Sequence, residues 1–288
     1  MAASALLFAF MGFFARLATA STSWATVGAA RALVGAAVAV AFARMRGASL
    51  RGGRTRDMWL RSLFGTGAMM CTFYALSSRA LPLGDTVTLL NLSPVLLALV
   101  APLLLGERTT GAGAIGIAVA LAGVVFVAQP AFLFHTARPA APLGGPTAGI
   151  TAAFAIAAAS FTALAMTMLR RVGRTTSPEA VALHFSLVAA AAMTAISLID
   201  PKIPSPRDAA AMLAAGLCAG VGQLTMTRAY ATERAARVGG MSYLSVVVSA
   251  ALGAAALGEV PSKPALLGMA LVVTGGVVLA LRDKTAAR

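Results

Sequence analysis

Two stretches of the sequence decide the fold: residues 92–129, LSPVLLALVAPLLLGERTTGAGAIGIAVALAGVVFVAQ, and residues 244–281, LSVVVSAALGAAALGEVPSKPALLGMALVVTGGVVLAL. Aligned without gaps at a shift of 152 residues, they share 12 identities in 38 positions. A Gly-Glu pair, Gly106-Glu107 in one stretch and Gly258-Glu259 in the other, is followed in both by two glycines at the same spacing. We interpret the two stretches as copies of one duplicated unit, of the kind that leaves weak internal symmetry in a sequence.

The composition is that of a membrane protein. Of the 288 residues, 59% are hydrophobic and only 11% are charged, whereas a soluble domain carries about 25% charged residues. The composition therefore excludes an ordinary soluble enzyme, a nucleic-acid-binding domain and a disordered tail. The net charge of +14 fits the Lys- and Arg-rich cytoplasmic loops of membrane proteins better than it fits a nucleic-acid partner.

Ten apolar windows are long enough to cross about 30 Å of hydrocarbon as helices. They are residues 2–19, 24–43, 60–79, 85–105, 111–129, 147–169, 178–199, 209–231, 238–257 and 264–281. Because hydrophobicity does not alternate with a period of two, helices are favoured over a barrel. The first window ends in Ala18-Thr19-Ala20, which is similar to a signal-peptidase site, but no Lys or Arg precedes the apolar run. We therefore interpret this window as a retained helix.

Basic residues in the connecting segments and at the window ends, Arg61 and Arg79 among them, predict the orientation. With the N-terminus inside, the inside segments hold fifteen Lys and Arg residues and the outside segments hold five. Cytoplasmic loops carry this excess of positive charge. We expect a multi-pass protein of the cell inner (cytoplasmic) membrane with both termini in the cytoplasm.

The windows divide into two groups of five. We expect a first five-helix repeat over residues 1–129, a Pro-rich outside linker over 130–146, and a second five-helix repeat with a short cytoplasmic tail over 147–288. Since five is odd, the second repeat enters the membrane inverted relative to the first. The predicted fold is all-α, with ten transmembrane helices as two inverted five-helix repeats, an architecture of secondary transporters with a substrate site near the bilayer midplane.

The run FYALSSRALPLGDTVTLLNLSPVLLALVAPLLLGERTTGAGAIGIAVALAGVVFV, residues 73–127, resembles an EamA domain of the drug/metabolite transporter superfamily. In that family a helix rich in small residues is followed by a Pro-bearing helix, a Gly-Glu turn and a Gly-rich final helix. Residues 230–281 resemble the same half-domain, with Val246 in place of Pro94. The resemblance implies a ten-helix carrier of small metabolites, most similar to bacterial amino-acid and metabolite exporters, including the aromatic amino-acid type.

Several chemistries lack their motifs. The sequence has no G-x-x-x-x-G-K-[ST] loop for ATP-driven pumping, no H-E-x-x-H or G-x-S-x-G motif for hydrolysis, and only two histidines, His135 and His184. Its two cysteines, Cys71 and Cys218, lie in apolar runs. We therefore expect no enzyme activity, no catalytic residue, no cofactor and no bound metal.

Polar residues within the windows are candidates for substrate binding. Asn91 and Ser93 lie beside Pro94, which removes a backbone hydrogen bond and is expected to kink the helix, and Tyr243 and Ser245 lie at the matching place in the second repeat. The alternative for such groups is interhelical hydrogen bonding. Four further candidates provide polar or polarisable side chains: Tyr74, Gln223, Met226 and Tyr230.

Charged and titratable residues within the windows are few. Arg31 is predicted either to bond helix-end carbonyls or to contact a substrate carboxylate, whereas Arg16 and Arg228 are expected to extend to the membrane surface. His184 is a possible proton site, or a packed histidine bonded to a hydroxyl. Glu107 and Glu259 are expected to stabilise the N-terminus of the helix that follows each, or to act in gating.

These patterns predict a facilitative or weakly coupled transporter that exports small neutral or zwitterionic metabolites, most simply amino acids, by alternating access. A cavity with few fixed charges is the basis for that substrate class. The expected partners are a small-molecule substrate and membrane lipids, and no nucleic acid. The alternatives are a nucleotide-sugar or sugar-phosphate carrier, a multidrug exporter of the same superfamily, or a non-transporting membrane scaffold.

Overall fold

The computed structural model describes residues 1–50, 55–97, 99, 111–129, 147–172, 176–199, 201–232 and 241–282. All regular structure in these ranges is helical. The named helices are α1 (Ala2–Ala18), α2 (Trp24–Arg46), α3 (Arg56–Ser77), α4 (Leu83–Leu90), α6 (Gly111–Ala128), α8 (Ala148–Val172), α9 (Pro178–Ser197), α10 (Pro206–Thr232), α12 (Leu244–Leu257) and α13 (Lys263–Arg282). The predicted Gly106-Glu107 turn, Arg108 and the 130–146 linker lie outside the described residues.

Four of these helices are long and apolar enough to cross a membrane. They contain the spans Trp24–Arg46, Ala148–Val172, Pro178–Ser197 and Pro206–Tyr230. Five shorter apolar helices accompany them. The structure thus gives a helical protein with several membrane-length helices, and the number of crossings remains a prediction from the sequence.

Local sequence explains several helix ends. The side chains of Ser23, Thr55 and Ser177 each accept a hydrogen bond from a backbone amide of the helix that follows, which satisfies one of its free donors. Gly47 and Gly258 end α2 and α12 with φ of 62° and 67°, a left-handed conformation that glycine adopts without steric cost.

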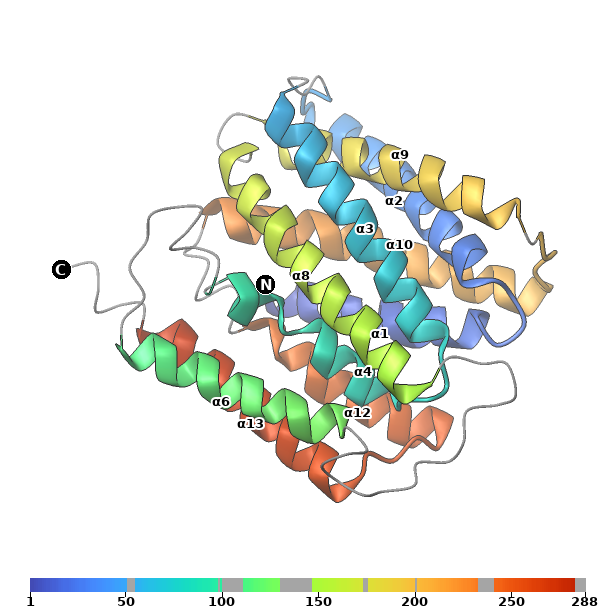
Figure 1. The fold of residues 1–288 in the computed structure, drawn as a ribbon. Coiled ribbons are helices and arrows are strands. Elements are labelled where there is room, and N and C mark those ends of the chain that lie inside the picture. The colour runs from blue at the N-terminus through green and yellow to red at the C-terminus, as the bar shows by residue number, and fades with distance from the viewer. Residues whose placement is uncertain are drawn as a thin grey trace.

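A single shift of 152 residues relates the helices of the two halves. It carries α1 onto α8, α2 onto α9, α3 onto α10 and α6 onto α13, within six residues at each end. The contacts follow the same relation: α3 packs along α8 and α1 along α10, while α2 packs along its own counterpart α9 and α6 along α13. Figure 1 shows α2 and α9 together at one end of the helix array and α6 and α13 together at the other.

The contact between α6 and α13 is made by glycines. A Cβ on Gly275 would lie 2.5 Å from the carbonyl oxygen of Gly116, and a Cβ on Gly123 would lie 2.7 Å from that of Gly268. The 152-residue shift carries Gly116 onto Gly268 and Gly123 onto Gly275. The contacts are crossed, because Gly116 meets Gly275 and Gly123 meets Gly268. Small residues let helix backbones approach closely where lipid provides no hydrophobic drive for packing.

Both halves contain a break in a helix at matching positions. α4 ends at Leu90 and Asn91 and Leu92 form a turn, so the predicted helix over 85–105 is interrupted there. In the second half, Tyr243 forms a turn before α12 begins at Leu244, although this segment has no proline. Asn91 and Tyr243 are themselves 152 residues apart. The two turns lie close together, since Asn91 donates a hydrogen bond to Ser245, two residues after Tyr243.

Candidate functional site

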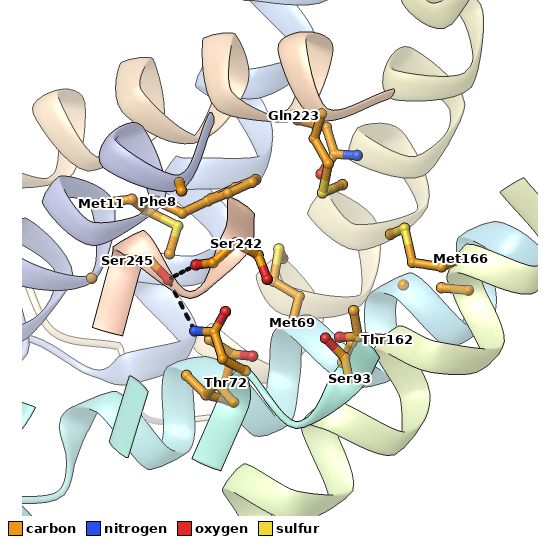
Figure 2. A pocket seen from close by; sticks show the side chains of 18 of the residues that line it. Phe8, Met11, Met69, Thr72, Ser93, Thr162, Met166, Gln223, Ser242 and Ser245 are labelled. Atoms are coloured by element: carbon orange, nitrogen blue, oxygen red, sulfur yellow. Dashed lines mark hydrogen bonds between the residues drawn. The ribbon is translucent and has the colours of Figure 1, made fainter. Parts of the chain in front are cut away.

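A cavity of about 210 Å³ lies between the two halves. Most of its wall is apolar, and Figure 2 shows Phe8, Met11, Met69 and Met166 around it. Thioether and aromatic side chains of this kind adapt to apolar ligands of different shape. The volume suits a small metabolite, and the wall suits one with an apolar body.

Polar groups gather where the two helix breaks meet. Asn91 Nδ2 donates to Ser245 Oγ at 3.0 Å and to the carbonyl oxygen of Val87 at 2.9 Å. Ser245 Oγ in turn donates to the carbonyl oxygen of Ser242 at 2.7 Å (Figure 2). Ser93 lines the same cavity and lies near Thr162 (Figure 2). This cluster joins the first half to the second and provides hydroxyl and amide groups for a ligand.

Two arginines, Arg31 of α2 and Arg61 of α3, line the same cavity. Only 6% of Arg31 and 1% of Arg61 is exposed. Their guanidinium carbons lie 5.3 Å and 4.7 Å from the centroid of the Phe185 ring in α9. Cation–π contact of this kind recovers about 0.5–2 kcal/mol. Each arginine costs about 2.5–3.5 kcal/mol near the centre of a membrane helix, so one shared ring offsets only part of the cost of two buried cations.

Gly65 makes room for the Arg61 guanidinium. It lies one helical turn after Arg61, and a Cβ there would overlap Arg61 Nη1 and would lie 2.9 Å from the Phe185 ring. Any larger residue would therefore displace the guanidinium or the ring. Glycine at this position allows Arg61 to lie back along α3 and against α9.

Eight of the sequence-predicted site residues line the cavity: Arg31, Asn91, Ser93, Pro94, Gln223, Met226, Tyr230 and Ser245. Tyr74 lies elsewhere, with its ring centroid 4.2 Å from that of Phe154 and 5.9 Å from that of Trp24. Tyr243 is buried against Gly276, while its neighbour Ser242 reaches the cavity.

His184 is also not among the residues that line the cavity, although its chain neighbour Phe185 is. Its Nδ1 lies 2.7 Å from Ser62 Oγ, and its ring meets that of Trp59 edge to face at 4.7 Å. This is the arrangement of a histidine bonded to a hydroxyl. The sequence left two interpretations of His184 open, a proton site and a packed histidine bonded to a hydroxyl. This geometry favours the packed histidine.

The main cavity residues that the sequence analysis missed are Arg61 and Phe185. Arg61 was counted with the inside-loop charges, but α3 begins at Arg56, which places Arg61 in the second turn of a helix and in the cavity wall. The expectation of a cavity with few fixed charges therefore needs correction, because two cations line it. The available signal was Gly65, four residues after Arg61 on the same helix face.

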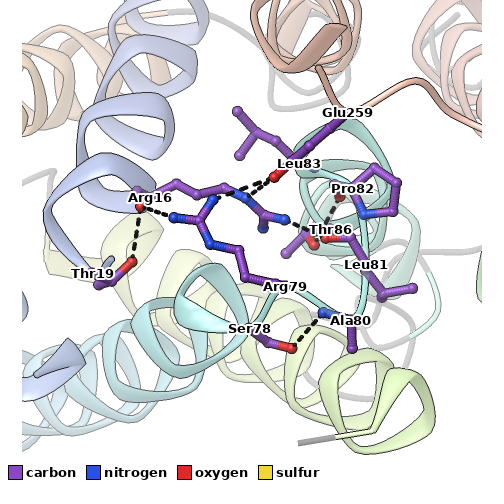
Figure 3. A network of polar contacts seen from close by, with 10 residues as sticks. All are labelled: Arg16, Thr19, Ser78, Arg79, Ala80, Leu81, Pro82, Leu83, Thr86 and Glu259. Carbon is purple, nitrogen blue, oxygen red and sulfur yellow. Dashed lines mark hydrogen bonds and ion pairs between the residues drawn. The ribbon is translucent and has the colours of Figure 1, made fainter. Parts of the chain in front are cut away.

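A polar network closes the structure one helical turn beyond Gly12, the last α1 residue of the cavity (Figure 3). Arg16 Nε donates to Glu259 Oε1 at 2.8 Å, and Arg16 Nη2 donates to the carbonyl oxygen of Leu81 at 2.6 Å. Arg79 approaches the same Glu259 oxygen at 3.4 Å. Arg16 is fully buried, so the expectation that it extends to the membrane surface is wrong.

Glu259 also has a different role from the one expected of it. Its Oε2 accepts a hydrogen bond at 2.7 Å from the backbone amide of Leu83, the first residue of α4. The carboxylate therefore stabilises the N-terminus of a helix in the other half rather than that of α13, which follows it in sequence.

Arg228, near the opposite end of the bundle, is half-exposed and lies 3.9 Å from Glu179.

Within the described ranges, no three His, Cys, Asp or Glu side chains lie together in a way that could hold a metal ion. None of the described residues that line the cavity is Asp, Glu or Lys. The arrangement can hold a small organic molecule with an apolar body and acceptor oxygens, between two halves joined by polar contacts.

Comparison with known proteins agrees with this arrangement. The model of the EamA-like transporter family matches residues 1–129 and 149–281. The pseudopaline exporter CntI from one strain of Pseudomonas aeruginosa is 25% identical over 255 residues, covering 88% of this chain and 85% of the relative, and CntI from a second strain is 26% identical over 257 residues with the same coverage. A solved crystal structure of a protein superposes on this chain with a TM-score of 0.71, at 24% sequence identity, and the match covers 99% of both chains.

Proposed function

Because the chain belongs to the EamA-like transporter family, and is thus a multi-pass membrane transporter, we propose that it exports small organic metabolites as a secondary, facilitative or weakly coupled carrier. The observation that carries the proposal is a metabolite-sized cavity between two matched halves, closed at one end by the Arg16–Glu259 network. Alternating access requires a site of this kind, closed toward one side of the membrane at a time.

Ten crossings in two inverted repeats fit this function. The 152-residue relation between helices, the reciprocal glycine contacts of α6 and α13, and the matched helix breaks all support repeats related by a two-fold axis in the membrane plane. The excess of basic residues supports cytoplasmic termini in the inner membrane. In that orientation the cavity, which Met1 and Arg61 line at one end, is nearer the cytoplasm, and the Arg16–Glu259 network closes the outer side.

The direction and substrate class rest on the relatives and on the wall chemistry. The CntI relatives are named as exporters, and we infer export here also. Amino acids and related carboxylic acids are the first substrates to test, because the wall offers apolar surface, hydroxyl and amide groups and two arginines. A non-transporting membrane scaffold would not need this cavity. A multidrug exporter or a sugar-phosphate carrier would be identified by the substrates that it transports.

Transport by the purified full-length protein in liposomes tests the proposal. Vesicles loaded with an unlabelled amino acid, organic acid, sugar phosphate or cationic drug should accumulate the labelled form of a transported solute by counterflow. Protein-free vesicles are the control. Flux that continues without a pH gradient supports a facilitative carrier. The absence of counterflow for every amino acid, organic acid, sugar phosphate and cationic drug tested would refute the transporter assignment.

A further inference from the structure

The strongest unexplained feature of the cavity is its pair of buried arginines. We propose that Arg31 and Arg61 form a subsite for the carboxylates of the transported solute, and that the carrier prefers organic acids whose negative charges outnumber their positive charges. This inference rests on the proposed function and narrows it, because the sequence alone suggested neutral or zwitterionic substrates.

The first argument is that donors of both guanidinium groups are left without partners. Arg31 Nε, Arg61 Nε and Arg61 Nη1 are buried and form no hydrogen bond within the described residues. Arg31 Nη1 donates a weak hydrogen bond to the sulfur of Met69 at 3.2 Å. Buried donors are almost always paired, so these donors indicate a missing acceptor. The cavity that both residues line is the place where an acceptor from outside the chain can enter.

The second argument is charge balance. The guanidinium groups of Arg31 and Arg61 both contact the Phe185 ring, and the described cavity wall includes no carboxylate to neutralise their charges. A zwitterion would neutralise at most one charge and would bring its own ammonium group near the other. A solute with two carboxylates, or with one carboxylate and no ammonium group, balances the pair better. The planar fork of a guanidinium also matches the two oxygens of a carboxylate.

The third argument distinguishes carboxylate from phosphate, which arginine also binds. Phosphorylated sugars carry several hydroxyl groups that need polar walls, whereas Phe8, Met11, Met69 and Met166 make this cavity largely apolar. Hydroxyl and amide groups form a smaller part of the wall, which they share among Thr72, Asn91, Ser93, Thr162, Gln223, Tyr230, Ser242 and Ser245. Such a wall fits an organic acid with a hydrocarbon body.

Binding to the unaltered protein provides the first test. The thermal stability of the detergent-purified full-length protein is measured with glutarate, with its uncharged diamide glutaramide, with leucine and with glycerol 3-phosphate. A ligand that binds the folded state raises the unfolding temperature. We expect glutarate to stabilise the protein at a concentration at least tenfold lower than glutaramide or leucine. Equal responses to the acid and its diamide would overturn the proposal, and a stronger response to glycerol 3-phosphate would replace carboxylate with phosphate.

Substitution provides the second test. Arg61→Gln and Arg31→Gln should each weaken glutarate binding about tenfold or more while leaving the response to glutaramide within twofold. Arg61→Lys should give an intermediate loss, because it keeps the charge but not the fork. The matched control is Arg56→Gln, which removes the same charge from an exposed position on the same helix and should change nothing. Equal losses for acid and diamide would show that the arginines are structural and would overturn the proposal.

The two proposals can fail separately. Counterflow of neutral solutes by a protein that does not distinguish glutarate from glutaramide leaves the transporter assignment in place and removes the carboxylate subsite. Selective binding of glutarate without counterflow of any solute leaves the subsite in place and removes the transporter assignment. Should the arginine variants fail to fold, the comparison of acid with diamide on the unaltered protein still decides the question.

Discussion

The buried guanidinium of Arg16 and the carboxylate of Glu259 are joined at 2.8 Å although 243 positions separate them in the sequence. The pair ties the end of α1 in the first half to the segment between α12 and α13 in the second. Glu259 also accepts from the first amide of α4, so one carboxylate connects three elements. Movement of the two halves apart at this end has to break that connection.

Glu259→Gln is therefore expected to favour opening at this end. The substitution leaves the Arg16 charge buried without its counter-ion, and loss of one partner of a buried ion pair destabilises a protein by about 3–5 kcal/mol. Because Glu259 is partly exposed, we expect a destabilisation near the lower end of that range. The measurement is the rate at which an impermeant thiol reagent labels Val87→Cys, a buried cavity residue, in a background without Cys71 and Cys218. Because about 1.4 kcal/mol corresponds to a factor of ten, labelling from outside should become roughly a hundredfold faster.

Arg79→Gln is the matched control for this prediction. Arg79 approaches the same carboxylate oxygen, but at 3.4 Å and with 40% of its side chain exposed. Exposed ion pairs contribute only about 0–1 kcal/mol, so its effect on labelling should be much smaller. Equal labelling rates in Glu259→Gln and the unaltered protein would contradict a role of the pair in closure.

Gly268→Ala tests the close contact of α6 with α13. The added Cβ would lie 2.6 Å from the carbonyl oxygen of Gly123, and a backbone atom cannot move aside cheaply. Overpacking of this kind costs about 1–3 kcal/mol. We expect a lower unfolding temperature in detergent. Gly149→Ala, where the nearest atom is 3.9 Å away, should leave the unfolding temperature within error, and a similar loss in both variants would argue against specific glycine packing.

The repeat could be predicted from the sequence because its signal does not depend on which way side chains face. Gly116, Gly123, Gly268 and Gly275 stand at fixed spacing in the sequence, and the structure brings them into reciprocal contact. Most helix positions followed from hydropathy in the same way. The break at Asn91 was indicated by Pro94, which was expected to kink this helix. Hydropathy alone would not have placed it, since a hydropathy window measures apolar character and is insensitive to two residues of turn.

The cavity wall could be predicted only in part. Lipid and protein interior are equally apolar, so a membrane helix gives little indication of which face turns inward. Tyr74 illustrates the problem, because it lies on the inward-facing helix α3 but packs against Phe154 rather than in the cavity. Arg61 was missed because a charge near a helix start is similar to a loop charge, and its burial depends on Gly65 and on Phe185 of another helix.

His184→Gln tests whether the histidine couples transport to protons. Its Nδ1 is engaged with Ser62, and it is not among the residues that line the cavity. We expect the variant to transport with the same dependence on a pH gradient as the unaltered protein, and to lose about 1 kcal/mol of stability with the hydrogen bond. Counterflow at several pH values inside and outside the vesicles provides the measurement. A pH dependence that disappears in the variant would make His184 a proton site.

Opposite placement of Arg108 and Lys263 is the prediction on which the inverted architecture depends. Arg108 follows the first Gly-Glu pair and Lys263 begins α13 shortly after the second, so they occupy similar places in the two repeats. Five crossings per repeat put such positions on opposite sides of the membrane. In intact cells an impermeant thiol reagent should label Lys263→Cys and not Arg108→Cys, whereas permeabilised cells should show both. Arg44→Cys, expected inside, is the control for cell integrity. Labelling of Arg108→Cys and Lys263→Cys from the same side would mean repeats related by an axis along the membrane normal, and would overturn the inverted architecture.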